Sequence, residues 1–339
     1  MKLNFKNLNF LDNYNTDFKY ICLLIIHIFI GVLLYKFPFT SKIYGFFISI
    51  IGLYFIIKNK NRNNEVLYVA SYIVGSEVLL RATNGAISYE FAKYSITFFM
   101  LLGIFFSGFS KKAYLYVLFL LLLIPSILIS IDNFNVDFKK KLFFDILGPI
   151  CLWFCSIYCY NKKVSQSEIN SILLNVGLPI VTLCSFLFFK SPISFINERC
   201  TESSFELSGF FGPNQVATIL GIGMFVFFLR VVLISSSKII LFTNILLSSF
   251  MFYRGLLTFS RGGVITGLAM IFILLFFITI YKNKLVLPKL KYPLLFIFTS
   301  FLLITIITNH QTYGLLLKRY ANKMFLAQKI IMQKQEERH

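Results

Sequence analysis

The sequence predicts an all-α protein, a polytopic transmembrane helical bundle. Two features of composition carry this prediction: 57% of the 339 residues are hydrophobic and only 14% are charged, and the mean hydropathy is +0.76. In a soluble domain about a quarter of the residues are charged. A third feature is that uncharged apolar runs recur along almost the whole chain. Because backbone in lipid must satisfy its own hydrogen bonds, these runs are expected to be helices.

We expect about eleven membrane spans, since each span needs roughly 20 predominantly apolar residues. The apolar runs cover residues 20–35, 43–57, 66–80, 94–109, 113–130, 142–160, 172–189, 213–228, 239–253, 262–281 and 292–308. No repeat and no Pro/Ser-rich linker divides them, so residues 1–309 are predicted to form a single transmembrane domain. Residues 310–339 are predicted to form an extracytoplasmic basic tail.

The formal net charge of +19 is explained by basic loops beside anionic membrane lipids, and it does not require a nucleic acid as partner. Before the tail is counted, Lys and Arg are more frequent in the loops on the side of the N-terminus, which predicts a cytoplasmic N-terminus. The basic tail offsets this excess, so the orientation also depends on the family resemblance described below.

No Cys or His pattern in the sequence has the spacing of metal ligands. Cys151, Cys155 and Cys159 share one face of a predicted helix, which is typical of small apolar residues in packing. We therefore expect no metal ion and no cofactor.

Two helix starts are predicted to face the outer side of the membrane. The segment GFFGPNQ begins the run 213–228 with Asn214 in its first turn, and TFSRGG begins the run 262–281 with Ser260 as N-cap. Arg261 and Gly262 follow in the first turn. Helix N-termini offer unpaired N–H groups and a partial positive charge, which together attract anions. A lipid-linked pyrophosphate is the expected anion at this depth.

Three arginines are expected near the same side of the membrane: Arg81, Arg254 and Arg261 end or begin apolar runs there. A permanent cation beside hydrocarbon requires a partner, and the planar guanidinium suits bidentate binding of phosphate. In the alternative interpretation, each arginine reaches singly to a lipid headgroup.

Carboxylates accompany one of these arginines. Glu77 lies four residues before Arg81, so an intrahelical ion pair is predicted, and Glu90 and Lys93 repeat this arrangement. A structural network is the favoured role for these side chains. Glu77 or Glu90 is alternatively a general base for an acceptor hydroxyl, and further candidates for that role are His310, just beyond the last apolar run, and the loop 190–211.

At these motifs the sequence resembles a known family. GFFGPNQVATILGIGMF, followed one helical hairpin later by RGLLTFSRGGVITG, resembles the O-antigen ligase and polysaccharide polymerase superfamily of bacterial integral membrane proteins. EVLLRATNGAISYEFAKY is also similar to a segment of some members. The resemblance implies an architecture like that of membrane-embedded GT-C-type glycosyltransferases. It also implies that Arg254 or Arg261, and Arg319 in LLLKRYANK, contact a pyrophosphate.

The activity implied by the resemblance is a metal-independent glycosyl transfer at the periplasmic face of the bacterial inner membrane. The donor is an undecaprenyl-pyrophosphate-linked glycan, and the acceptor is a glycan for a polymerase or the lipid A core for a ligase.

Family members continue into a large periplasmic loop, whereas this chain stops at QKQEERH. The tail is therefore expected to be the start of a truncated loop, which leaves the enzymatic activity of this chain open. Two alternatives also stay open. One is a transporter or flippase for polysaccharide or small solutes, and the other is an inactive truncated member of the family.

Overall fold

The computed structural model shows a chain built from helices. It describes residues 10–122, 125, 136–195, 203–233, 237–280, 287–318 and 320–321, and no strand occurs in these ranges. The all-α fold class is therefore confirmed. The α-helices are α1 Phe10–Lys36, α2 Thr40–Asn59, α3 Glu65–Ala82, α4 Phe91–Ser107, α5 Leu115–Leu121, α7 Val136–Cys159, α8 Gln166–Lys190, α9 Pro213–Leu233, α10 Lys238–Leu257, α11 Arg261–Ile280 and α12 Leu287–Gln311.

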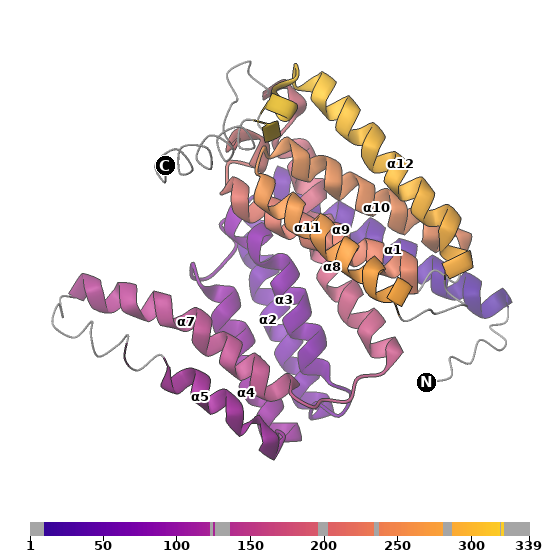
Figure 1. Ribbon diagram of the computed structural model, residues 1–339. Coiled ribbons are helices and arrows are strands. Elements are labelled where there is room, and N and C mark those ends of the chain that lie inside the picture. The colour runs from indigo at the N-terminus through magenta and orange to yellow at the C-terminus, as the bar shows by residue number, and fades with distance from the viewer. Residues whose placement is uncertain are drawn as a thin grey trace, which may run out of the picture. The chain divides into compact units, whose positions relative to one another are not determined.

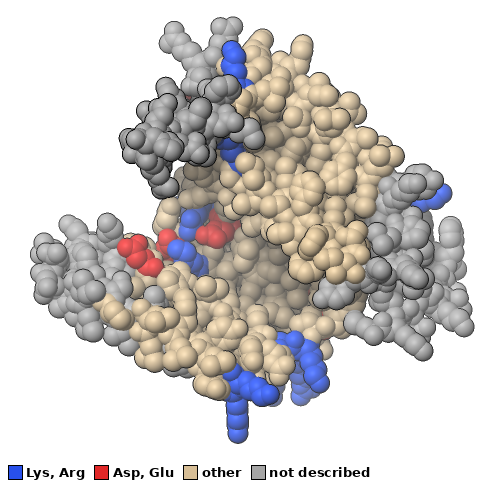
Figure 2. All heavy atoms as spheres, viewed as in Figure 1, with Lys and Arg blue, Asp and Glu red and all other residues tan. Residues whose placement is uncertain are grey.

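Among the described helices, seven are long and apolar enough to cross a membrane, namely α1, α2, α8, α9, α10, α11 and α12. The helix α4 and the Phe144–Cys159 part of α7 are apolar but shorter. The described surface in Figure 2 is largely uncharged, and large apolar side chains such as Phe272 (62% exposed) and Leu302 (63%) face outward. Extensive exposed apolar surface marks contact with a membrane or a partner. The long apolar helices indicate a membrane protein.

The predicted span 113–130 differs in its described part. There, a 3-10 turn (Lys111–Tyr114) precedes the seven-residue helix α5. A helix of this length extends about 10 Å, whereas the hydrocarbon core is about 30 Å thick. Residues 123–124 and 126–135 of this region lie outside the described residues. The count of about eleven spans therefore stays a prediction.

The chain divides into two compact units. The middle unit consists of Phe37–Pro179, and the terminal unit consists of Met1–Lys36 together with Ile180–His339. The single domain expected for residues 1–309 and the extracytoplasmic tail expected for residues 310–339 stay predictions.

In the terminal unit, α9 packs against both α10 and α11, and α10 also packs against α12 (Figure 1). Phe227 and Phe228 of α9 are fully buried. The rings of Phe252 on α10 and Phe301 on α12 stack with centroids 4.4 Å apart. Since α9 contacts both neighbours and its side chains are the most enclosed, α9 is the central helix of this unit.

In the middle unit, α3, α4 and α7 enclose a core that includes Ile73, Phe99 and Tyr158. Gly103 of α4 makes room for the ring of Tyr158, because a Cβ at this position would lie 2.6 Å from its Cε2 atom. The amide of Asn61 donates to the Tyr158 hydroxyl at 2.8 Å. Its Oδ1 accepts from the backbone N–H of Val66 at 3.0 Å, which fixes the start of α3.

Candidate anion-binding site

The helices α9 and α11 meet at their backbones. A Cβ added to Gly263 would lie 2.2 Å from the carbonyl carbon of Ala217, and one added to Gly267 would lie 2.8 Å from the Gly221 oxygen. Only glycine permits such an approach. Because both contacts advance along the two helices together, α9 and α11 run in the same direction, and their N-termini lie at one end of the terminal unit.

A hydrogen bond joins the two helix starts. The Ser260 hydroxyl donates to Oδ1 of Asn214 at 2.8 Å, which ties the SRGG start of α11 to the GPN start of α9. The backbone N–H of Ser260 donates to the Thr258 hydroxyl at 3.1 Å. Ser260 directly precedes α11, as expected for an N-cap, and its hydroxyl links the two motifs.

The two adjacent glycines of SRGG occupy different environments. Gly263 is buried in the contact with α9, whereas Gly262 is exposed and a Cβ there would meet no atom within 4 Å. Packing therefore requires glycine at position 263 but not at position 262. The exposed residues in the first two turns of α9 and α11 are the polar Asn214, Gln215, Thr218 and Thr266, together with Gly262 and the apolar Ile265.

The first turns of α9 and α11 have the features of an anion-binding site. The first N–H groups of a helix have no acceptors within that helix, and they carry the positive end of its dipole. Arg261 is the first residue of α11 and is partly exposed. The arrangement therefore combines two helix N-termini, exposed hydroxyl and amide groups, and a cation.

Arg254 has a different environment from Arg261. Its side chain is 2% exposed, and its guanidinium donates to three backbone oxygens: those of Leu187 at 3.1 Å, Ser191 at 3.2 Å and Leu207 at 3.5 Å. Leu187 lies in the last turn of α8, and its oxygen also accepts from the backbone N–H of Ser191 at 2.9 Å. Arg254 therefore anchors the end of α8 to the end of α10. Contact of Arg254 with a pyrophosphate stays a prediction.

The segment before α9 is held by the same helix ends. The N–H of Ser204 donates to the oxygen of Thr258 at 2.9 Å, and the N–H of Gly209 donates to the Ser191 hydroxyl at 2.8 Å. Gly209 has a positive φ of 75°, a conformation that suits glycine. Together with the Arg254 contact to Leu207, these bonds fix the chain that leads into the GPN motif.

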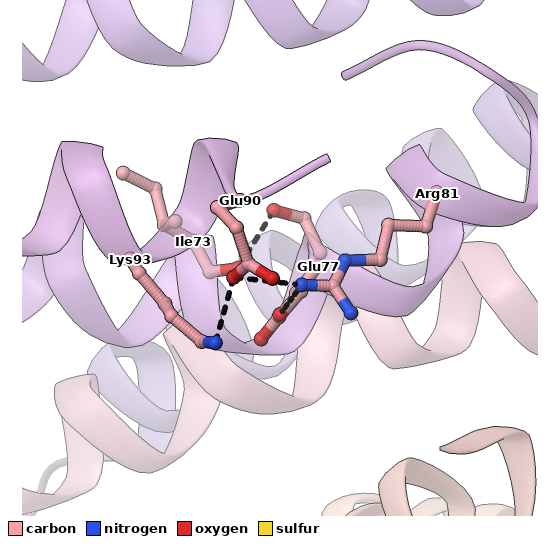
Figure 3. A network of polar contacts seen from close by, with 6 residues as sticks. Ile73, Glu77, Arg81, Glu90 and Lys93 are labelled. Atoms are coloured by element: carbon pink, nitrogen blue, oxygen red, sulfur yellow. Dashed lines mark hydrogen bonds and ion pairs between the residues drawn. The ribbon is translucent and has the colours of Figure 1, made fainter. Parts of the chain in front are cut away.

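The middle unit contains a charged network on α3 and α4 (Figure 3). Arg81 pairs with Glu77 at 2.8 Å and with Glu90 at 3.4 Å, and Lys93 pairs with Glu90 at 2.7 Å. The Arg81 guanidinium also lies 4.4 Å from the ring centroid of Tyr89. The predicted pairs Glu77–Arg81 and Glu90–Lys93 are both present. Glu77 is the more accessible carboxylate, since its side chain is 30% exposed and that of Glu90 is 8% exposed.

The structure brings some of the predicted site residues together. Asn214, Ser260, Arg261 and Gly262 lie at the joined starts of α9 and α11. Glu77 and Arg81 belong to the network of the middle unit. His310 is exposed in the last turn of α12, and Arg319 lies outside the described residues.

Sequence reasoning missed three hydroxyl groups of this region, those of Ser191, Ser204 and Thr258. Each one accepts a hydrogen bond from a backbone N–H group near a helix end. Their signal in the sequence is the usual preference of Ser and Thr for such positions, which is too common to identify a site.

Within the described residues, no three His, Cys, Asp or Glu side chains are arranged to hold a metal ion. The expectation of a site without metal or cofactor stays a prediction. A scan against protein-family models gives no match, and neither does a comparison with curated proteins or with solved structures. The fold and the geometry of the two motifs are therefore the basis of the functional proposal.

Proposed function

We propose that the chain is a membrane-embedded glycosyltransferase that binds a prenyl-linked pyrophosphate at the joined N-termini of α9 and α11. The particular activity we propose is that of an O-antigen ligase or polysaccharide polymerase. A single observation carries the proposal: the Ser260 hydroxyl bonds to Asn214 at 2.8 Å. It joins the two motifs on which the family resemblance rests, although they are separated in sequence by a helical hairpin.

The contacts between α9 and α11 support a rigid binding site. Gly263 and Gly221 bring the two backbones into contact, and Arg254 holds the segment before α9. Preorganised donors stabilise developing charge better than donors that must first reorient. We propose that Arg261, Asn214 and the exposed backbone at Gly262 contact the pyrophosphate, while Arg254 positions the segment next to it.

In the proposed reaction, an acceptor hydroxyl oxygen forms a bond to the anomeric carbon of the donor sugar. The bond from that carbon to the pyrophosphate oxygen breaks, and the pyrophosphate leaves with the electron pair. Its negative charge grows during this step, and the helix N-termini with Arg261 oppose that charge.

The proton of the acceptor hydroxyl passes to a base. We propose His310 for this role, because its ring is exposed in the last turn of α12, which belongs to the terminal unit. The hydroxyl of Tyr253, next to Arg254, donates to Oε1 of Gln311 at 3.1 Å and so holds this turn against the end of α10. Glu77, the other candidate from the sequence, belongs to the charged network of the middle unit.

The proposal includes the location and the partners of the protein. The chain would lie in a bacterial inner membrane with a cytoplasmic N-terminus, and the joined helix starts would face the periplasm. The donor would be an undecaprenyl-pyrophosphate-linked glycan and the acceptor a glycan or the lipid A core. The seven long apolar helices support the membrane part of this proposal.

Binding of farnesyl pyrophosphate to the purified chain tests the proposed site. Charge-assisted hydrogen bonds contribute about 1.5–3 kcal/mol, so Arg261→Ala is expected to weaken binding by about ten-fold or more. Ser260→Ala is expected to weaken it less, because the change removes a link between the helices rather than a charge. Equal affinity of the native chain and Arg261→Ala contradicts the proposed site.

Lys238→Ala is the matched control for Arg261→Ala. Lys238 is likewise the cationic first residue of a long helix of the terminal unit, α10, and it follows a serine N-cap, Ser237. Lys238 is exposed, whereas Arg261 is partly exposed. Its removal is expected to leave the affinity for farnesyl pyrophosphate unchanged. A loss of affinity equal to that of Arg261→Ala would indicate general attraction by surface charge.

Reconstitution into vesicles with a glycan-linked undecaprenyl pyrophosphate separates transfer from transport. Release of undecaprenyl pyrophosphate together with an elongated or lipid-linked product supports the transferase. Movement of the intact donor across the bilayer without its cleavage would contradict it and support a flippase.

A further inference from the structure

The middle unit has a groove at the start of α2. It has a volume of about 650 Å³ and lies between the first turns of α2 and the connection from α3 to α4. Its lining consists of Lys42, Ile43, Phe46, Phe47, Gly85, Ala86 and Ile87. None of these residues belongs to the charged network or to the candidate anion-binding site.

The walls of the groove are fixed to each other. The hydroxyls of Ser41 and Thr83 share a hydrogen bond, and a Cβ at Gly45 would lie 2.6 Å from the oxygen of Gly85. The N–H of Gly85 also donates to the oxygen of Leu80 at 2.8 Å, at the end of α3. The groove is therefore part of the packed structure of this unit.

The groove has an apolar wall that faces outward. Phe46 and Phe47 are each 56% exposed, and Ile87 is 69% exposed. They lie on or beside α2, which is long and apolar enough to cross a membrane. Large apolar side chains in such a position indicate a hydrocarbon ligand.

Lys42 gives the groove one charged end. It is the one charged residue of the lining, it is exposed, and it lies in the first turn of α2, where the helix dipole adds positive charge. It forms no ion pair with the residues that the structure describes. An apolar groove that ends at a cation of this kind complements a molecule with a hydrocarbon chain and an anionic headgroup.

We propose that this groove binds one anionic phospholipid of the surrounding bilayer. The acyl chain lies against Phe46, Phe47 and Ile87, and the lipid phosphate pairs with Lys42 at the N-terminus of α2. Zwitterionic lipids bind less well, because their own cationic group already compensates the phosphate charge. This proposal does not depend on the glycosyltransferase proposal.

Quenching of a reporter tryptophan by brominated lipid tests this site. The chain has one tryptophan, Trp153, and its buried Nε1 atom has no hydrogen-bond partner, so Trp153→Phe provides a background without tryptophan. Phe47→Trp then places the reporter in the groove. The protein is reconstituted in phosphatidylcholine vesicles that contain either brominated phosphatidylglycerol or brominated phosphatidylcholine.

The reporter at position 47 is expected to be quenched preferentially by the anionic lipid. One lysine near the membrane surface corresponds to about a five-fold preference. Lys42→Gln is expected to abolish the preference. Lys58→Gln, which removes an exposed lysine at the other end of α2, is expected to retain it.

Two further variants make the result decisive. Phe46→Trp is a second reporter in the groove and is expected to show the same preference if Phe47→Trp does not fold. Phe272→Trp reports on a lipid-facing position of α11 that is 62% exposed and lies outside the groove, and it is expected to show no preference. Equal quenching by both lipids in the groove reporter, or a preference that survives Lys42→Gln, would overturn the proposal.

Discussion

Two polar regions of this protein surround an arginine with different partners, and the arginine is buried in the first region and partly buried in the second. In the terminal unit, Arg254 is surrounded by backbone oxygens of Leu187, Ser191 and Leu207. In the middle unit, Arg81 is surrounded by the carboxylates of Glu77 and Glu90. The first region uses fixed peptide dipoles and the second uses countercharges on side chains.

The difference affects what each region is suited to do. Backbone oxygens carry no formal charge, so the Arg254 region keeps a net positive charge. In the Arg81 network, the carboxylates of Glu77 and Glu90 lie against Arg81 and Lys93, so the charges of the side chains compensate each other. Anion binding therefore suits the terminal unit better than the middle unit.

The largest effect is expected from removing Arg254. Arg254→Ala leaves the backbone oxygens of Ser191 and Leu207 buried without their donor, whereas the oxygen of Leu187 keeps the N–H of Ser191 at 2.9 Å. At about 1–3 kcal/mol for each unpaired oxygen, the unfolding free energy is expected to fall by about 2–6 kcal/mol. Thermal unfolding of the purified protein in detergent measures this loss. Arg254→Lys is expected to restore part of it, because an ammonium donates but lacks the planar fork. An unchanged unfolding midpoint in Arg254→Ala would show that the oxygens find other donors.

A smaller loss of stability is expected from disturbing the contact between α9 and α11, because this contact is made by backbone atoms and involves no charge. Gly263→Ala places a Cβ 2.2 Å from Ala217 and is expected to destabilise the protein by about 1–3 kcal/mol through overpacking. The adjacent Gly262→Ala is its control. Its Cβ meets open space, so it is expected to stabilise the helix by about 0.5–1 kcal/mol. If both substitutions shift the unfolding midpoint in the same direction, α9 and α11 are not in backbone contact.

The sequence predicted the features that depend on neighbours along the chain. Apolar runs located the helices, because hydropathy marks the segment that faces lipid or core. The pair Glu77–Arg81 was predicted from its spacing of four residues, which fixes the geometry once the segment is a helix. The run 113–130 is the exception, since a 3-10 turn and the short α5 occupy its described part.

The features that depend on distant residues were not predictable. The partners of Arg254 lie 47 to 67 positions away in the chain, so the sequence could not distinguish an arginine that reaches a headgroup from one that binds carbonyl groups. The bond between Ser260 and Asn214 depends on the parallel packing of α9 and α11, which pairs residues 46 positions apart. The motifs indicated two helix starts, and the fold adds that they touch.

The smallest loss of stability is expected from substitutions in the Arg81 network, and its size is expected to differ between the two carboxylates of that network. Glu90→Gln removes the charge that pairs with both Arg81 and Lys93 at 8% exposure, which is expected to lower the unfolding free energy by about 1.5 kcal/mol. Glu77→Gln removes a more exposed partner and is expected to lower the unfolding free energy by about 0–1 kcal/mol.

Because salt screens exposed pairs more than buried ones, raising the ionic strength is expected to erase the Glu77 effect and to leave most of the Glu90 effect. Unfolding midpoints of the two variants at low and high salt measure both expectations. If the two effects fall equally with salt, both carboxylates are solvated, and the contrast with the Arg254 region would then be one of exposure rather than of the kind of partner.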